Sequence, residues 1–337
     1  MSAAADPYPK IELHVHLEAT LQPARLLELA RRNGVALPAD SVEGLREFCR
    51  FSDFPHFIDV WIATTQVLRT ARDYREMVVD YAVEASGHGC VYLEAILTPV
   101  EAARRGTPWQ EVMEGACDGS HEAKELTGVE VRLTLDTPRG FTLEEAKETA
   151  RWGIRYRERG VVALGLGGLE AEYPPEPFAP AFALARAGGL GSVPHAGEAA
   201  GPASIRGALE TLAPDRIRHG VRAVEDDALL AELAARGIVL DVTPISNLRT
   251  GVVSEIGEHP LPRLLAAGIP CSISTDDPAL MDTDLSRDCA AAVSLGHTPR
   301  GMFEAGLRGA LCDEQTRERL REIGERFDWG GGGGGGG

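Results

Sequence analysis

The chain has 337 residues, of which 44% are hydrophobic and 25% are charged, a balance typical of a globular protein with a large core. Its formal net charge of -17 at pH 7 repels nucleic acid phosphates and anionic lipids, so we expect neither as a partner and favour a small-molecule substrate. The sequence has neither a signal-peptide pattern nor an apolar run of membrane-spanning length, which predicts a cytoplasmic protein. The six cysteines lack C-x-x-C spacing and are interpreted as reduced thiols, most of them buried.

Short apolar segments recur along the chain and alternate with segments of helical pattern. The apolar segments that we predict as strands are 11–17, 91–98, 129–136, 161–167, 191–195, 216–219, 238–243 and 270–275. Such alternation is typical of a parallel α/β sheet, and its length matches a closed (β/α)8 TIM barrel of about 250 residues. A doubly wound open sheet is the alternative, but no G-x-G-x-x-G motif follows the first strand.

The helical segments are marked by their ends. The long interval after the first strand predicts inserted helices at 20–33 and 48–70. Thr142 and Glu145 form a capping-box pattern that opens a helix ending near Gly160, and a helix at 225–236 ends before Gly237. We expect a single barrel domain over 1–329, with the glycine run 330–337 as a tail outside the fold.

Two histidines, His14 and His16, alternate along the first predicted strand. Side chains at i and i+2 of a strand point to the same face, which suits two ligands of one metal ion. His195 and Asp276 lie where later strands end, and strand ends ring the mouth of a barrel. Three imidazoles and a carboxylate predict one Zn²⁺ per chain, with Fe²⁺ or Mn²⁺ as alternatives.

Three further polar residues lie next to these predicted ligands in the sequence. Glu198 follows His195 by three residues. This places it close enough to the predicted metal to act as a proton donor or acceptor. His219 and Asp277 are predicted to orient the water that the metal activates. The other histidines have no such neighbours and are interpreted as surface or core residues: His56, His88, His121, His259 and His297.

The set resembles the adenosine deaminase family of the amidohydrolase superfamily over most of residues 8–290. The matching motifs are PKIELHVHL at 9–17, HAGE at 195–198, RIRHG at 216–220, PISN at 244–247 and STDDP at 274–278. The resemblance implies a single metal, because the strand at 161–169 has no lysine of the kind that bridges two metals in other amidohydrolases.

The resemblance also implies a role for each site residue. His14, His16, His195 and Asp276 would hold the metal, and Glu198 would donate a proton to the purine N1 during attack at C6. His219 and Asp277 would orient the attacking hydroxide, and Asp277 would also contact N7. The backbone N–H of Gly168 would meet N3, and ammonia would leave.

The substrate is indicated by departures from the family pattern. Glu18 stands where adenosine deaminases carry the aspartate that contacts the ribose 5′-hydroxyl. The subgroup that the chain resembles most is the 6-aminodeoxyfutalosine deaminases of menaquinone biosynthesis, through VYLE at 91–94, GLGGLE at 165–170 and LRTG at 248–251. That substrate carries a carboxylate, for which Arg139, Arg249 and Arg69 are candidate partners. The alternatives are adenosine or adenine deamination and, in another class, a non-catalytic nucleoside-binding barrel.

Overall fold

The computed structural model describes residues 8–51 and 54–330, so most of the predicted glycine tail lies outside the described residues. Nine strands occur in these ranges, and every pairing between them is parallel. The strands are β1 Lys10–His16, β2 Cys90–Leu97, β3 Glu130–Pro138, β4 Val161–Gly167, β5 Gly191–Ser192, β6 His195–Ala196, β7 Arg216–His219, β8 Val239–Val242 and β9 Cys271–Ile273.

The strands form two sheets of order β1-β2-β3-β4-β5 and β6-β7-β8-β9, which meet at two seams. At the first seam, Pro194 separates β5 from β6 and has no N–H to donate, so the predicted strand 191–195 is split. Its first half pairs with β4 and its second half with β7. At the second seam, Val15 of β1 bridges Asp276, with His16 N donating to Asp276 O at 2.7 Å.

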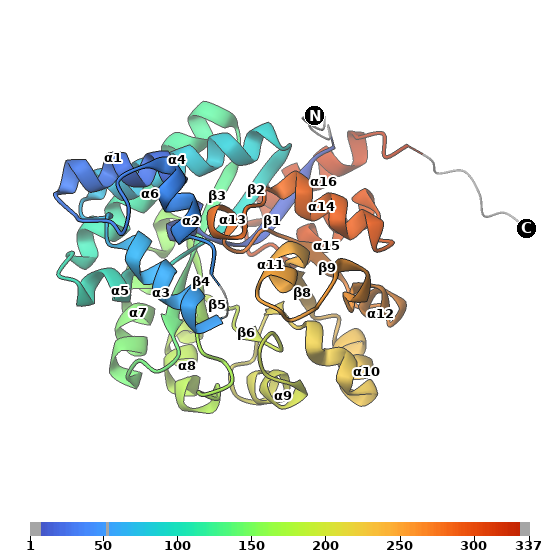
Figure 1. Ribbon diagram of the computed structural model, residues 1–337. Coiled ribbons are helices and arrows are strands. Elements are labelled where there is room, and N and C mark those ends of the chain that lie inside the picture. The colour runs from blue at the N-terminus through green and yellow to red at the C-terminus, as the bar shows by residue number, and fades with distance from the viewer. Residues whose placement is uncertain (1–7, 52–53, 331–337) are drawn as a thin grey trace, which may run out of the picture.

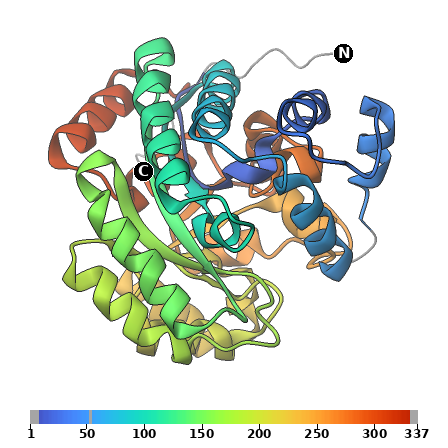
Figure 2. The same ribbon diagram turned by 90° about the vertical axis from the view of Figure 1, so that its left-hand side faces the viewer.

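Counting β5 and β6 as one interrupted strand, eight strands follow one another around a ring. This arrangement confirms the predicted (β/α)8 barrel and excludes the open sheet, whose edge strands would have no partners at the two seams. The mouth is the end at which the parallel strands finish. In Figure 1, helices such as α7, α8, α9 and α10 stand around the ring, whereas α13 overlaps the strands in that view, and Figure 2 shows α6, α7 and α8 outside the long strands β3 and β4.

The helices fall between and after the strands. Their bounds are α1 Pro23–Asn33, α2 Val42–Phe48, α3 Phe54–Thr65, α4 Ala71–Gly87, α5 Pro99–Arg104, α6 Trp109–Thr127, α7 Leu143–Arg155, α8 Ala179–Ala187, α9 Pro202–Thr211, α10 Asp227–Arg236, α11 Pro244–Arg249, α12 Leu261–Ala266, α13 Pro278–Met281, α14 Leu285–Ser294, α15 Pro299–Gly309 and α16 Glu314–Arg326. Short 3₁₀ turns are η1 Leu17–Thr20, η2 Arg157–Arg159, η3 Glu176–Phe178, η4 Val221–Glu225 and η5 Ile256–Glu258.

The predicted insertion between β1 and β2 is present as α1 to α4. The predicted helix 48–70 is wrong in its bounds, because α2 ends at Phe48 and α3 ends at Thr65. The next helix, α4, has its own capping box, in which the Asp73 carboxylate accepts from Thr70 N at 2.8 Å. Thr70 is therefore a helix start, and the chain must leave the helical path before it.

Two predicted caps are confirmed. Thr142 and Glu145 exchange the capping-box hydrogen bonds at the start of α7. Gly237 ends α10 with φ of 61°, a left-handed conformation that glycine adopts without strain. The helix α7 stops at Arg155, and η2 fills the interval before Gly160.

Charged side chains are buried within the barrel as pairs. Arg216 bonds to Glu94 at 2.5 Å and to Asp241 at 2.6 Å, and all three side chains are fully buried. Arg218 bonds to Asp136 at 2.6 Å. Because a buried charge is tolerated only when it is paired, these contacts fix how the strands face one another.

Two simpler predictions can be compared with the described residues. The six cysteines are free thiols, and all but Cys312 are buried, as expected. Among the described helices, we find none long and apolar enough to cross a membrane.

Candidate metal and proton-transfer site

The four predicted metal ligands converge at the mouth of the barrel. His14 and His16 come from β1, His195 begins β6, and Asp276 follows β9. One ligand atom of each lies within 4.8 Å of those of all the others. The alternation of β1 places its two imidazoles together, and the ring of strands brings the other two ligands to them.

The spacing of the ligand atoms fits a single cation. His195 Nε2 lies 3.0 Å from His14 Nε2 and 3.2 Å from His16 Nε2. Asp276 Oδ1 lies 3.1 Å from His14 Nε2 and 3.4 Å from His16 Nε2. In a tetrahedral Zn²⁺ site with bonds of about 2.0–2.1 Å, ligand atoms lie about 3.3–3.4 Å apart, so the four side chains fit such an ion.

Two of the three imidazoles present lone pairs to the centre of this group. His195 Nδ1 lies 2.9 Å from Leu166 O, and His14 Nδ1 lies 3.4 Å from Asp241 O. Because a carbonyl oxygen only accepts, each Nδ1 carries the proton and each Nε2 does not. Two lone pairs that face each other at 3.0 Å need a cation between them.

Burial keeps these imidazoles neutral, as metal ligands must be. Burial lowers the pKa of His14 to about 3 and lowers the pKa of His195 well below its usual range. The backbone is also unusual here, because Asp276 and His219 have φ of 68° and 61°. Non-glycine residues in this left-handed region cost free energy, and such strain gathers at functional sites.

The three predicted proton-transfer residues lie beside the ligands. His219 Nε2 is 3.4 Å from Glu198 Oε2 and 3.7 Å from Asp276 Oδ2. Burial raises the pKa of Glu198 to about 7, so its protonated form is available near neutral pH. Burial and the adjacent Asp276 raise the pKa of Asp277 well above its usual range. Asp277 Oδ1 is buried without a hydrogen-bond partner, so it can bind a ligand atom in the cavity.

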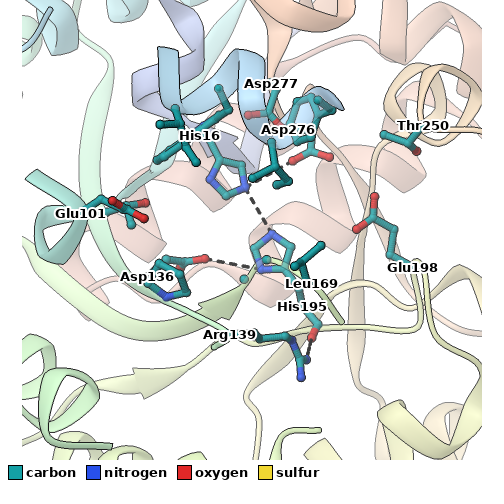
Figure 3. A pocket seen from close by; sticks show the side chains of 18 of the residues that line it. His16, Glu101, Asp136, Arg139, Leu169, His195, Glu198, Thr250, Asp276 and Asp277 are labelled. Carbon is teal, nitrogen blue, oxygen red and sulfur yellow. Dashed lines mark hydrogen bonds and ion pairs between the residues drawn. The ribbon is translucent and has the colours of Figure 1, made fainter. Parts of the chain in front are cut away.

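A cavity of about 260 Å³ opens onto these groups. In Figure 3, Glu101 and Asp136 lie on one side of it, and Glu198 and Thr250 lie on the other. The remaining wall is largely apolar and is formed by Phe57, Ile58, Trp61, Ile62, Pro138, Phe141, Leu169 and Met281. The cavity therefore combines the polar side chains of the ligand group with an apolar wall that suits an aromatic ligand.

The predicted substrate-binding residues separate into two groups. Gly168 lines the cavity, with φ of +92°. Glu18 is not part of the cavity lining, because its Oε1 turns to accept from Thr98 N at 2.6 Å.

The candidate arginines also differ in their placement. Arg139 lines the cavity, but its guanidinium donates to Tyr173 O at 2.5 Å and to His195 O at 2.7 Å. Arg249 and Arg69 do not line it, although Arg249 Nε donates to the carbonyl of Met281, a residue of the cavity wall, at 3.3 Å.

Three acidic residues at the site were not singled out from the sequence, and one of them, Asp136, lines the cavity with its Oδ2 3.5 Å from His195 Nδ1. Glu101 lies in α5 and lines the cavity, and its Oε2 lies 3.4 Å from Arg105 Nη1. Glu170 is buried, and its carboxylate accepts hydrogen bonds from the backbone that carries Glu198. Glu170 lies within the quoted GLGGLE motif, which could have indicated it, whereas we find no local pattern that marks Glu101.

The fold and the site together define a class of hydrolase, in which the mouth of a (β/α)8 barrel holds a divalent metal next to a proton donor. A family model described as "Adenosine deaminase" matches residues 9–324, and the chain belongs to that family. It is accordingly a deaminase, a hydrolase that acts on C–N bonds, and the alternative of a non-catalytic barrel is not retained.

Known proteins resemble the chain along most of its length. It is 50% identical over 333 residues to an aminodeoxyfutalosine deaminase of Acidothermus cellulolyticus, covering 97% of this chain and 94% of that protein. It is 38% identical over 283 residues to an adenine deaminase of Rhodospirillum rubrum, covering 84% of each. Among solved structures, an amidohydrolase of Burkholderia ambifaria with bound Zn matches with a TM-score of 0.87 and 26% identity, covering 95% of this chain and 90% of that one.

Proposed function

We propose that this deaminase removes the amino group at C6 of an aminopurine nucleoside by hydrolysis of the C6–N bond. We further propose that its substrate is 6-aminodeoxyfutalosine, a precursor in menaquinone biosynthesis. The observation that carries the reaction is the convergence of His14, His16, His195 and Asp276 on one point beside the buried Glu198. The substrate is supported by the 50% identity to an aminodeoxyfutalosine deaminase.

We further propose that one Zn²⁺ occupies the ligand group. The nitrogen and carboxylate donors are those that zinc prefers, their spacing fits its bond lengths, and the Burkholderia ambifaria amidohydrolase was solved with bound Zn. A divalent cation held there supplies Lewis-acid chemistry that makes a water molecule nucleophilic near neutral pH.

Two side chains, Glu198 and His219, then transfer the protons of the reaction. Glu198, protonated in part near pH 7, donates its proton to N1 of the purine as water adds to C6. His219, 3.4 Å from Glu198, accepts the proton of the attacking water and passes it to the leaving amino group. Breakage of the C6–N bond then releases ammonia, and the hydroxyl on C6 loses its remaining proton, which restores the acid form of Glu198 and leaves the 6-oxopurine.

Two further residues orient the base in this proposal. The Asp277 carboxyl, which burial and Asp276 favour in its protonated form by raising its pKa, donates to N7, and the backbone N–H of Gly168 donates to N3. Both line the cavity, so the purine lies between them with C6 toward the ligand group. Glu101, on the cavity wall, is in addition an acceptor for the hydroxyls of the ribose, which a free base lacks.

The aromatic carboxylate of the substrate lies at the outer part of the cavity. Phe57, Ile58 and Trp61 provide an apolar wall for its ring. Arg139 is engaged by two backbone carbonyls, whereas the side chain of Arg249 is 49% exposed and lies next to the cavity residue Met281. Arg249 is therefore the arginine that we assign to the carboxylate.

Adenine is the second candidate substrate, because the chain is 38% identical to an adenine deaminase over 84% of its length. Ammonia release from 6-aminodeoxyfutalosine, adenosine and adenine, each with and without a chelator, separates the candidates. We expect the highest kcat/KM for 6-aminodeoxyfutalosine and loss of activity with the chelator. Higher kcat/KM for adenine would overturn the proposed substrate, and full activity after removal of the metal would overturn the mechanism.

A further inference from the structure

The segment 195–200 carries both His195 and Glu198, yet it has little regular secondary structure. The strand β6 covers only His195–Ala196, and α9 begins at Pro202. Gly197 has φ of 76°, and a Cβ atom placed there would lie 2.4 Å from Ile205 Cδ1, so the chain turns sharply just before Glu198. Such a turn leaves backbone N–H groups that no strand or helix can satisfy.

One buried carboxylate accepts these N–H groups. Glu170 Oε1 accepts from Gly197 N at 2.5 Å. Its Oε2 accepts from the N–H groups of Glu198, Ala199 and Ala200 at 3.0, 2.8 and 2.9 Å. Glu170 is only 5% exposed and comes from the connection that follows β4, so a residue from a neighbouring unit of the barrel holds the whole turn.

Two arginines hold the same segment by its carbonyl groups. Arg139 Nη2 donates to His195 O at 2.7 Å, and Arg222 Nη1 donates to Ala199 O at 2.8 Å. Among these three anchors, Glu170 is the one that bonds to the backbone of Glu198 itself. Glu170 accepts four hydrogen bonds from the segment, whereas each arginine donates one to it, so Glu170 restricts the turn most.

We propose that Glu170 is a positioning residue for deamination, whose carboxylate fixes the turn 197–200 so that the Glu198 side chain faces the cavity. This inference rests on the proposed role of Glu198 as proton donor. A displaced donor would still allow the nucleoside to bind, since the cavity wall is formed largely by other elements. Loss of the anchor should therefore act on the chemical step, where a shift of about 1 Å can cost about 100-fold in rate.

The test compares Glu170→Gln with the matched control Glu172→Gln, which alters an exposed glutamate two residues away. The glutamine oxygen can still accept from the three N–H groups of 198–200, while its amide nitrogen opposes Gly197 N. We expect kcat for 6-aminodeoxyfutalosine to fall at least about tenfold, with KM changed by less than about twofold. Zinc content should stay near that of the unaltered enzyme, and the melting temperature should fall by only a few degrees, because one buried N–H loses its acceptor. The control should match the unaltered enzyme in every measurement.

The pH profile of kcat provides a readout that a merely structural role would not move. Glu198 is faced by His219, Asp276, Asp277 and Glu170, and the negative charge of Glu170 favours its protonated form. Removing that charge should move the fall of kcat with rising pH to lower pH. If Glu170→Gln changes neither kcat nor the pH at which kcat falls, the inference is overturned. It is also overturned if loss of zinc or of folded protein accounts for the whole decrease in kcat.

If Glu170→Gln is not recovered folded, Glu170→Asp replaces it. The aspartate keeps the charge but withdraws the carboxylate by one methylene, so kcat should still fall with KM preserved, and unaltered kcat would overturn the inference. An unaltered enzyme that releases no ammonia from aminopurine nucleosides would instead refute the proposed function. The two failures are thus distinguishable.

Discussion

Replacement of Glu198 by glutamine removes the proposed proton donor and leaves the shape of the side chain almost unchanged. Glu198 is buried beside His219, with 3.4 Å between its Oε2 and the imidazole Nε2. It lies outside the group of His14, His16, His195 and Asp276 that we propose to hold the metal, although with His219 it forms a second group that shares Asp276. We therefore expect the variant to fold and to bind zinc, but to lack the acid that protonates N1.

The size of the effect follows from the pKa of Glu198. Burial raises this pKa from 4.5 to about 7, so the carboxyl is about half protonated at pH 7. With an ordinary pKa, roughly one molecule in 300 would carry the proton at that pH. The environment of Glu198 thus increases the acid form by about two orders of magnitude, and general acids contribute about 10²–10⁴ in rate. We expect kcat of Glu198→Gln to fall by about 10²–10⁴, with KM nearly unchanged.

The assay is steady-state release of ammonia from 6-aminodeoxyfutalosine, with bound zinc measured in parallel. For the unaltered enzyme, kcat should decrease as pH rises through about 7, because Glu198 loses its proton there. The control is Glu210→Gln, which changes an exposed glutamate in α9. A Glu198→Gln variant that keeps more than about a tenth of the rate, with full zinc content, would refute the assignment of the proton donor.

Three further predictions test the metal, the substrate and one buried acid, Glu12. A chelator should abolish activity and lower the melting temperature, and added Zn²⁺ should restore both; a stable and active metal-free protein would contradict the ligand assignment. Arg249→Ala should raise KM for 6-aminodeoxyfutalosine by about tenfold or more and change KM for adenosine little, and equal changes would argue against a carboxylate contact. Burial raises the pKa of Glu12 from 4.5 to about 7, so between these pH values the folded state keeps a proton that the unfolded state loses. The unfolding free energy should therefore decrease as pH rises across that window, by on the order of 3 kcal/mol from this group. Glu12→Gln should weaken that decrease in urea unfolding at pH 5 and pH 8, and an identical slope would contradict the assignment.

Local features of the sequence were enough to predict the barrel and to pick out the four side chains that converge at its mouth. His14 and His16 share a face because strand side chains alternate, which holds in any parallel sheet. The Thr142 capping box and the Gly237 stop depend on neighbouring residues alone, and both occur as predicted. The repeated strand and helix pattern then requires His195 and Asp276 to meet them at the mouth.

Tertiary structure decided which side chains face the cavity. Glu18 and Glu101 are both acids that follow barrel strands, but Glu18 turns to Thr98 N while Glu101 lines the cavity. Arg139 lines the cavity, yet its guanidinium donates hydrogen bonds to backbone carbonyls 34 and 56 residues away along the chain. Glu170 accepts hydrogen bonds from backbone N–H groups that lie 27 to 30 residues later in the chain. These contacts depend on where distant backbone groups are left without partners, and that becomes defined only when the whole ring of strands has closed.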